Sequence, residues 1–186
     1  MRERSGGSPP EGAMTCSVFI ATSLDGFIAR QDGALDWLPH DTSEPHGYDE
    51  FIATVDAIVI GRKTFETVLT FDTWPYGAMQ VTVLSTTPTA LKAPDGAVCE
   101  FMAGPPEEVV RHLRARGVKH VYVDGGVTIQ GFMEAGRIQR MIITRIPVLL
   151  GSGIPLFGPL SHDVRLQHVA TRSYPSGLVQ SEYVIG

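Results

Sequence analysis

The sequence is poor in cysteine, in long apolar runs and in excess positive charge. Its two cysteines, Cys16 and Cys99, lack the spacing of a metal site or a disulfide framework, which favours a reducing compartment. No stretch approaches the roughly 18 consecutive apolar residues of a membrane span. The formal net charge of -5 offers no basic footprint for nucleic acid. We therefore expect a cytoplasmic protein without a metal site that binds neither membranes nor nucleic acid.

The apolar content, by contrast, is that of an ordinary globular domain. Of the 186 residues, 43% are hydrophobic and 19% are charged, which predicts a packed core rather than disorder. A chain of this length fits one domain. Residues 1–13 are rich in Gly, Ser, Pro and charge, so we expect a flexible arm there and a folded domain over residues 14–186.

Short β-branched apolar runs alternate with segments of helical spacing. The runs typical of buried parallel strands are 17–22, 57–60, 81–84 and 121–123. Apolar residues with helical spacing lie around Phe51, Phe65, Val109 and Ile129. Strands that alternate with helices predict a layered α/β domain with a mostly parallel sheet.

The pattern changes after Arg140. Residues 141–150 form a long strand-like run, and no segment with helical spacing follows it. Residues 164–174 and 178–185 flank Pro175-Ser176-Gly177 and are typical of a β-hairpin. We therefore predict an antiparallel C-terminal edge on the otherwise parallel sheet.

Segments suited to binding phosphate follow the predicted strands. They are the loop Ser23 to Ile28, the glycine-marked junctions 61–64 and 124–128, and the hydroxyl cluster 85–87. Open α/β sheets hold their ligands at the carboxyl ends of such strands. Each segment alone is also explained by a structural turn, a local cap or a helix start with solvated bases. Together they favour one extended, phosphate-bearing ligand, and a dinucleotide has the required length.

The junction Gly61-Arg62-Lys63-Thr64 has the most features suited to binding phosphate. Free N–H groups at a helix start bind phosphate, Thr64 adds a hydroxyl donor, and Arg62 and Lys63 add positive charge. The segment does not match G-x-x-x-x-G-K-[ST], which disfavours a nucleotide triphosphatase.

The order of these motifs resembles the dihydrofolate reductase superfamily. The motifs are Ser-Leu-Asp-Gly-Phe-Ile, Gly-Arg-Lys-Thr-Phe-Glu, Val-Leu-Ser and Gly-Gly before a helix. The chain is most similar to the branch with the reductase domain of bacterial riboflavin biosynthesis enzymes and its stand-alone relatives. This resemblance implies a three-layer fold, NADPH as cofactor, a homodimer, and reduction of a small pterin-like or ribosylaminopyrimidine-like substrate.

The resemblance also assigns contacts with the nicotinamide half of NADPH. Ala21 would meet the nicotinamide carboxamide through its backbone. A mobile loop over the nicotinamide ribose would contain Asp25, Gly26 and Ile28. The pyrophosphate and nicotinamide side would be approached by Gly125, Gly126, Val127 and Thr128.

At the other half of the cofactor, Arg62 would hold the adenosine 2′-phosphate and Thr64 the pyrophosphate. Gly61 would allow close approach, and Lys63 would add charge at the same point. Ser85 and Thr86 would lie near the adenosine ribose and its phosphate.

The chain departs from a dihydrofolate reductase proper in its acid. The family carries a carboxylate on the first helix, whereas the segment 44–51 offers Asp49 and Glu50, which do not match that position clearly. Both are kept as candidate catalytic residues, although an exposed first-turn carboxylate favoured by the helix dipole is the better explanation of each. Two alternatives stay open: an NADPH-binding sensor without turnover, and a non-redox enzyme acting on a phosphorylated metabolite.

Overall fold

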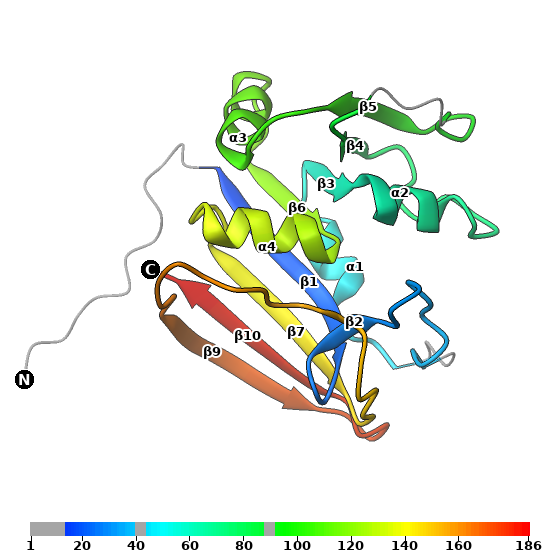
Figure 1. The fold of residues 1–186 in the computed structure, drawn as a ribbon, viewed down its shortest axis with the longest axis vertical. Coiled ribbons are helices and arrows are strands. Elements are labelled where there is room, and N and C mark those ends of the chain that lie inside the picture. The colour runs from blue at the N-terminus through cyan, green and yellow to red at the C-terminus, as the bar shows by residue number, and fades with distance from the viewer. Residues whose placement is uncertain (1–13, 40–43, 88–91) are drawn as a thin grey trace, which may run out of the picture.

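The computed structural model describes residues 14–39, 44–87 and 92–186, so the predicted arm over residues 1–13 lies outside it. An eight-stranded sheet with the order β5-β4-β3-β6-β1-β7-β10-β9 forms its centre (Figure 1). The parallel strands are β1 (Thr15–Ser23), β3 (Ala57–Gly61), β4 (Gln80–Leu84), β5 (Val98–Met102), β6 (His120–Asp124) and β7 (Arg140–Ile146). The antiparallel strands are β10 (Val179–Ile185) and β9 (Leu166–Ser173). A separate small sheet pairs β2 (Phe27–Ala29) with β8 (Ile154–Pro155).

Helices cover both faces of the large sheet. On one face lie α3 (Pro106–Ala115) and α4 (Gly126–Glu134), and on the other α1 (Tyr48–Ile52) and α2 (Arg62–Val68). Each helix buries an apolar stripe against the strands, which gives three layers. The layered α/β fold with a mostly parallel sheet, predicted from the sequence, is confirmed.

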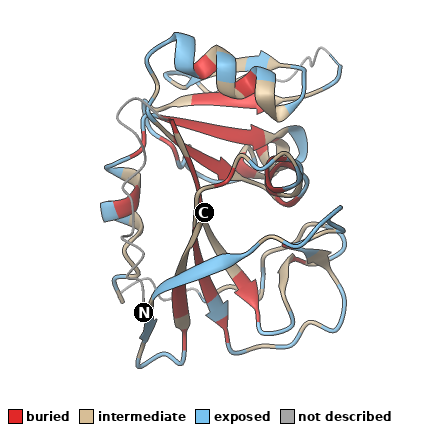
Figure 2. Cartoon of the chain, turned by 90° about the vertical axis from the view of Figure 1, so that its left-hand side faces the viewer, coloured by how far each residue is buried: buried red, intermediate tan, exposed pale blue. Residues whose placement is uncertain are grey.

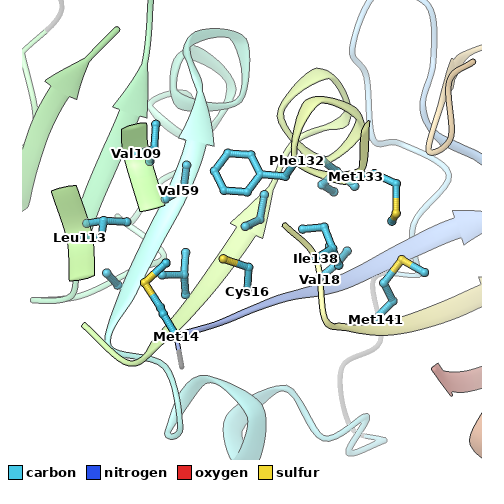
Figure 3. Close-up of a cluster of buried hydrophobic side chains, with 14 of the residues drawn as sticks. Met14, Cys16, Val18, Val59, Val109, Leu113, Phe132, Met133, Ile138 and Met141 are labelled. Carbon is cyan, nitrogen blue, oxygen red and sulfur yellow. The ribbon is translucent and has the colours of Figure 1, made fainter. Parts of the chain in front are cut away.

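The strand side chains explain why the central runs lack polar alternation. Along β3, Ala57 and Val59 pack in the core beneath α3 and α4, whereas Ile58 and Ile60 pack beneath α1 and α2. Successive residues of a strand point to opposite faces, so a strand covered on both sides must be apolar throughout. Figure 2 shows buried residues concentrated in these strands. In Figure 3, Phe132 of α4 and Leu113 of α3 lie within the first of these cores.

Strand β5 was missed by the sequence prediction because a charged residue interrupts it. Glu100 lies in the middle of β5 and accepts hydrogen bonds from Thr82 Oγ1 at 2.8 Å and from Arg116 Nη1 at 2.6 Å. A polar network therefore replaces apolar packing at this edge of the sheet. The partners of Glu100 come from β4 and from the end of α3, so local sequence does not reveal them.

The predicted strand over residues 141–150 was too long. Strand β7 ends at Ile146, and Pro147, which has no N–H to donate to the sheet, follows it. The predicted C-terminal hairpin is confirmed as β9 and β10. Within the described ranges, no helix has the length and apolar character needed to cross a membrane.

Candidate cofactor and active site

The two glycine-marked junctions lie in direct contact. Because β3 and β6 are parallel neighbours, the segments that follow them meet at one edge of the sheet. The Thr64 hydroxyl lies where a Cβ atom on Gly125 would be, and Thr128 Oγ1 lies 2.8 Å from the Cβ position of Gly61. Gly125 also has φ +89°, which L side chains rarely adopt. Each junction therefore requires its glycine so that the threonine of the other can pack against it.

Both junctions open helices whose first N–H groups have no side-chain cap. Gly61 and Gly125 precede α2 and α4 and have no side chain with which to cap the first N–H groups of the helix. In α4, Gly126 and Thr128 are buried, whereas Val127 is 79% exposed. Uncapped N–H groups at a helix start favour an anionic ligand.

Arg62 links the start of α2 to the hydroxyl cluster after β4. Its Nε donates to Glu66 Oε1 at 2.7 Å, and its Nη1 donates to Thr87 Oγ1 at 3.2 Å. The Ser85 hydroxyl in turn donates to the Thr87 carbonyl at 2.8 Å. Arg62, Lys63 and Thr86 are exposed, so the guanidinium and the ammonium remain accessible to a ligand. The structure thus brings Arg62 together with the predicted hydroxyl cluster, through Thr87.

The loop after β1 is fastened by Asp25. Its Oδ1 accepts from the Ser23 hydroxyl at 2.6 Å, and its Oδ2 accepts from the Gly151 N–H at 2.7 Å. The Ser23 hydrogen bond, followed by those from the Gly151 and Leu150 N–H groups, holds the pKa of Asp25 below its usual value. Asp25 therefore joins this loop to the segment that follows β7.

The small sheet covers the start of α4. Ile28 of β2 and Ile154 of β8 lie against Gly126, where a Cβ atom would be 2.9 Å from Ile28 Cδ1. Gly26, with φ +87°, accepts at its carbonyl from the Leu156 N–H at 3.0 Å. Three predicted cofactor residues, Gly26, Ile28 and Gly126, are thus held together by chain segments distant in sequence.

A row of small and polar side chains crosses the face of the sheet that carries α1. Ala21 of β1 is in register with Thr144 of β7, and Thr144 with Gln180 of β10. Gln180 Nε2 donates to Thr144 Oγ1 at 2.9 Å and to the His46 carbonyl at 2.8 Å. Ala21 was predicted from the sequence, but Thr144 and Gln180 were missed. Thr144 follows the apolar residues 141–143 of β7, whereas Gln180 lies among other polar residues of β10 and so gave no comparable signal.

The two predicted acids of α1 are exposed. Asp49 and Glu50 face away from the sheet, while Phe51 is buried and Tyr48 packs edge-on against Phe19 with ring centroids 5.5 Å apart. A different acid, Asp124 at the end of β6, is partly buried, and its Oδ1 accepts from the Gly125 N–H at 2.7 Å. Burial raises the pKa of Asp124.

The RibD C-terminal domain family model matches residues 15–180. The chain belongs to this family. Its relative YwjB of Bacillus subtilis (strain 168), whose function is uncharacterized, is 35% identical over 170 residues, which cover 90% of this chain and 95% of YwjB. This membership confirms the resemblance that the motifs suggested.

Solved structures extend the comparison. The crystal structure of a Shewanella sp. PV-4 protein assigned to riboflavin biosynthesis has 39% identity and a TM-score of 0.85, and the match covers 93% of this chain and 99% of that one. Dihydrofolate reductase from Enterococcus faecalis, complexed with NADP(H), has 19% identity and a TM-score of 0.64, covering 92% and 96%. The dihydrofolate-reductase-like fold is therefore confirmed, and the RibD C-terminal domain family supports a reductase-type function.

The contact between the junctions generates a stability prediction. Gly61→Ala should destabilise the protein because its Cβ would press on Thr128 Oγ1. In a Thr128→Ala background the same change should cost less, with a coupling energy of about 0.5–3 kcal/mol, as is typical of residues in contact. Urea unfolding of both single variants and the double variant measures this coupling. Additive losses would contradict the contact.

Proposed function

We propose that this protein is an NADPH-dependent reductase that transfers hydride to a small heterocyclic substrate, pterin-like or ribosylaminopyrimidine-like. The observation that carries this proposal is the contact between the Gly61 and Gly125 junctions, with Arg62 joining the hydroxyl cluster at one end. Phosphate-binding features at the ends of adjacent strands suit one extended ligand. Membership of the RibD C-terminal domain family supports the same class of reaction.

The residues present fit such a cofactor. At the adenosine end Arg62 and Lys63 would face the 2′-phosphate, with Ser85 and Thr86 beside the ribose. At the pyrophosphate, the glycine backbone at position 125 and the first N–H groups of α4 offer donors without an obstructing Cβ atom. Bound NADPH would supply the hydride, while the protein orients the reactants and excludes water.

The substrate would lie on the face of the sheet that carries α1. Ala21, predicted to meet the nicotinamide carboxamide, lies on β1 beside the buried polar pair Thr144 and Gln180. Gln180 is held by Thr144 and His46, so this pair presents a fixed pattern of polar atoms. Such a pattern suits a ring with several nitrogen and oxygen atoms better than a purely apolar substrate.

The reaction itself is tested by the loss of NADPH absorbance. We expect oxidation with a ribosylaminopyrimidine and poor turnover of dihydrofolate, because Asp49 and Glu50 are exposed rather than placed to grip a pterin ring. The absence of a positioned general acid typically costs about 10²- to 10⁴-fold. Efficient dihydrofolate turnover would contradict this specificity. NADPH binding without any oxidation across the substrates would instead favour a sensor.

Cofactor choice is tested at Arg62. Arg62→Ala should weaken NADPH binding by about 10- to 150-fold, the scale of one charged hydrogen bond of about 1.5–3 kcal/mol, and leave NADH binding nearly unchanged. Glu66→Gln is the matched control, because it removes the carboxylate that pairs with Arg62 and should maintain or strengthen NADPH binding. Calorimetric titration of both cofactors measures this. Equal losses for NADPH and NADH would remove Arg62 from the 2′-phosphate site.

The homodimer also remains a proposal, and the structure limits the segments through which two chains could pair. The apolar residues at the start of the run 141–150 are buried within the chain, as Met141 and Ile143 show, so they offer no surface to a second copy. Strand β9 remains, at the end of the sheet, with Val169 51% exposed. Exposed edge strands are prone to pair with another chain unless they are covered.

Light scattering tests the homodimer at micromolar concentration. We expect a dimer that Val169→Lys converts to monomer, because a charged side chain on an edge strand opposes pairing. Val98→Lys is the control, since Val98 is equally exposed on the opposite edge strand, β5. A monomeric wild-type protein, or equal effects of both changes, would refute pairing through β9.

A further inference from the structure

Three neighbouring strands carry a row of residues next to the start of α1. Strands β1, β7 and β10 lie side by side in the large sheet (Figure 1), and Ala21, Thr144 and Gln180 are in register across them. Because side chains alternate along a strand, Thr144 lies on the same face as Ile142, which packs in the core beneath α1 and α2. Both polar side chains of the row are buried, with 6% of Thr144 and 7% of Gln180 exposed.

The His46 carbonyl group determines which way the Gln180 amide is turned. A carbonyl oxygen can only accept, so the amide atom that faces it must be the nitrogen. Gln180 Nε2 accordingly donates to the His46 carbonyl at 2.8 Å. Gln180 Oε1 is the acceptor for the Tyr174 hydroxyl at 3.4 Å, which agrees with this orientation. The orientation of the amide is therefore fixed by groups that belong to the protein itself.

The same amide nitrogen determines the role of the Thr144 hydroxyl. Gln180 Nε2 donates its other proton to Thr144 Oγ1 at 2.9 Å. A hydroxyl group has one proton to donate and lone pairs with which to accept, and Gln180 takes one of the accepting positions. The hydroxyl proton therefore has to point to another atom. Among the residues that the structure describes, none accepts a hydrogen bond from Thr144 Oγ1.

A purely structural link does not account for this arrangement. The segment before α1 is already attached to the C-terminal hairpin by other contacts: the Ser176 hydroxyl donates to the Glu44 carboxylate, and the His46 ring packs edge-on against Tyr174 with ring centroids 5.0 Å apart. A buried hydroxyl proton without an acceptor is costly, and an apolar pair on these two strands would pack without that cost. An acceptor atom on a bound ligand would remove the cost at Thr144.

We propose that Gln180 is a positioning residue that makes Thr144 a hydrogen-bond donor toward the substrate, an inference that rests on the proposed function. Thr144 is in register with Ala21, the residue predicted to meet the nicotinamide carboxamide. The substrate atom that faces the Thr144 hydroxyl must then be an acceptor, such as a ring carbonyl oxygen, because an amino group would oppose one donor with another. The site therefore selects a pyrimidine with a carbonyl group at that position over an analogue with an amino group there.

The first test compares a substrate with its amino analogues. The probes are a ribosylaminopyrimidine whose ring carries carbonyl groups, and analogues in which one carbonyl group is replaced by an amino group. One analogue should be poorer by about 5- to 150-fold in kcat/KM, the range expected when a buried donor loses its acceptor. Thr144→Val should reduce this preference toward one, whereas Thr144→Ser, which keeps the hydroxyl, should retain it.

The second test reverses the direction of the hydrogen bond at Thr144. In Gln180→Glu, burial favours the neutral acid, which can donate to the His46 carbonyl and accept from the Thr144 hydroxyl. Thr144 then offers lone pairs to the substrate, so the preference should invert in favour of the amino analogue. Thr82→Val is the matched control, because it removes another buried strand hydroxyl, on β4, and should leave the preference unchanged.

Ligand binding gives a readout that does not depend on turnover. Calorimetric titration of each pyrimidine into the protein saturated with NADP⁺ should show the same preferences in Kd. A merely structural role of Gln180 would lower the affinity for all probes in the same proportion, so the ratio of affinities separates the two roles. Thermal melting of each variant identifies one that fails to fold. If Gln180→Glu is such a variant, the comparison of Thr144→Val with Thr144→Ser decides.

The outcomes separate the inference from the proposed function. Loss of the preference in Thr144→Val, together with its inversion in Gln180→Glu, supports the inference. A wild-type protein without a preference, equal preferences in Thr144→Val and Thr144→Ser, or a folded Gln180→Glu variant whose preference does not invert would overturn the positioning role alone. Failure of the wild-type protein to oxidise NADPH with any substrate would overturn the proposed function and this role with it.

Discussion

The site depends on the packing of two strand-to-helix junctions against each other. Parallel pairing of β3 with β6 brings Gly61 and Gly125 to the same edge, and only glycine leaves room there for the threonine side chains opposite. This packing positions the beginnings of α2 and α4, and with them the N–H groups suited to phosphate. A close-packed contact of this kind is stiff, so it holds the ends of two helices in one arrangement.

A second set of contacts attaches the remaining loops to this pair of junctions. Asp25 connects the loop after β1 to the segment after β7, and Gly126 receives the small sheet through Ile28 and Ile154. The nicotinamide side of the proposed site is therefore built from segments more than a hundred residues apart. Its geometry follows from tertiary contacts rather than from any one motif.

Sequence alone predicted the parts of the fold that depend on local pattern. The buried strands, the helices around Phe65 and Ile129 and the C-terminal hairpin followed from apolar spacing and turn residues. Strand β5 was not predicted, because the residues that donate hydrogen bonds to Glu100 are distant in sequence. Strand β7 was predicted too long, because Pro147 ends it and was not used as a stop signal. The motifs of the proposed cofactor site could also be recognised in the sequence, because each is a short, contiguous segment.

The inner face of the proposed site could not be predicted from the sequence, and helix geometry explains why the two acids predicted on α1 are exposed. Residues three and four apart lie on one face of a helix. In α1, Tyr48, Phe51 and Ile52 share the face that packs on the sheet. Asp49 and Glu50 fall between them and must point outward.

The short α1 helix therefore has no inward position left for a carboxylate. An acidic side chain does lie on this face, at the end of a strand. Asp124 occupies such a position because β6 alternates, placing every second side chain beneath α1 and α2. At the carboxyl end of that strand the apolar core gives way to the glycine junction, where the Asp124 carboxyl group accepts a hydrogen bond from the Gly125 N–H.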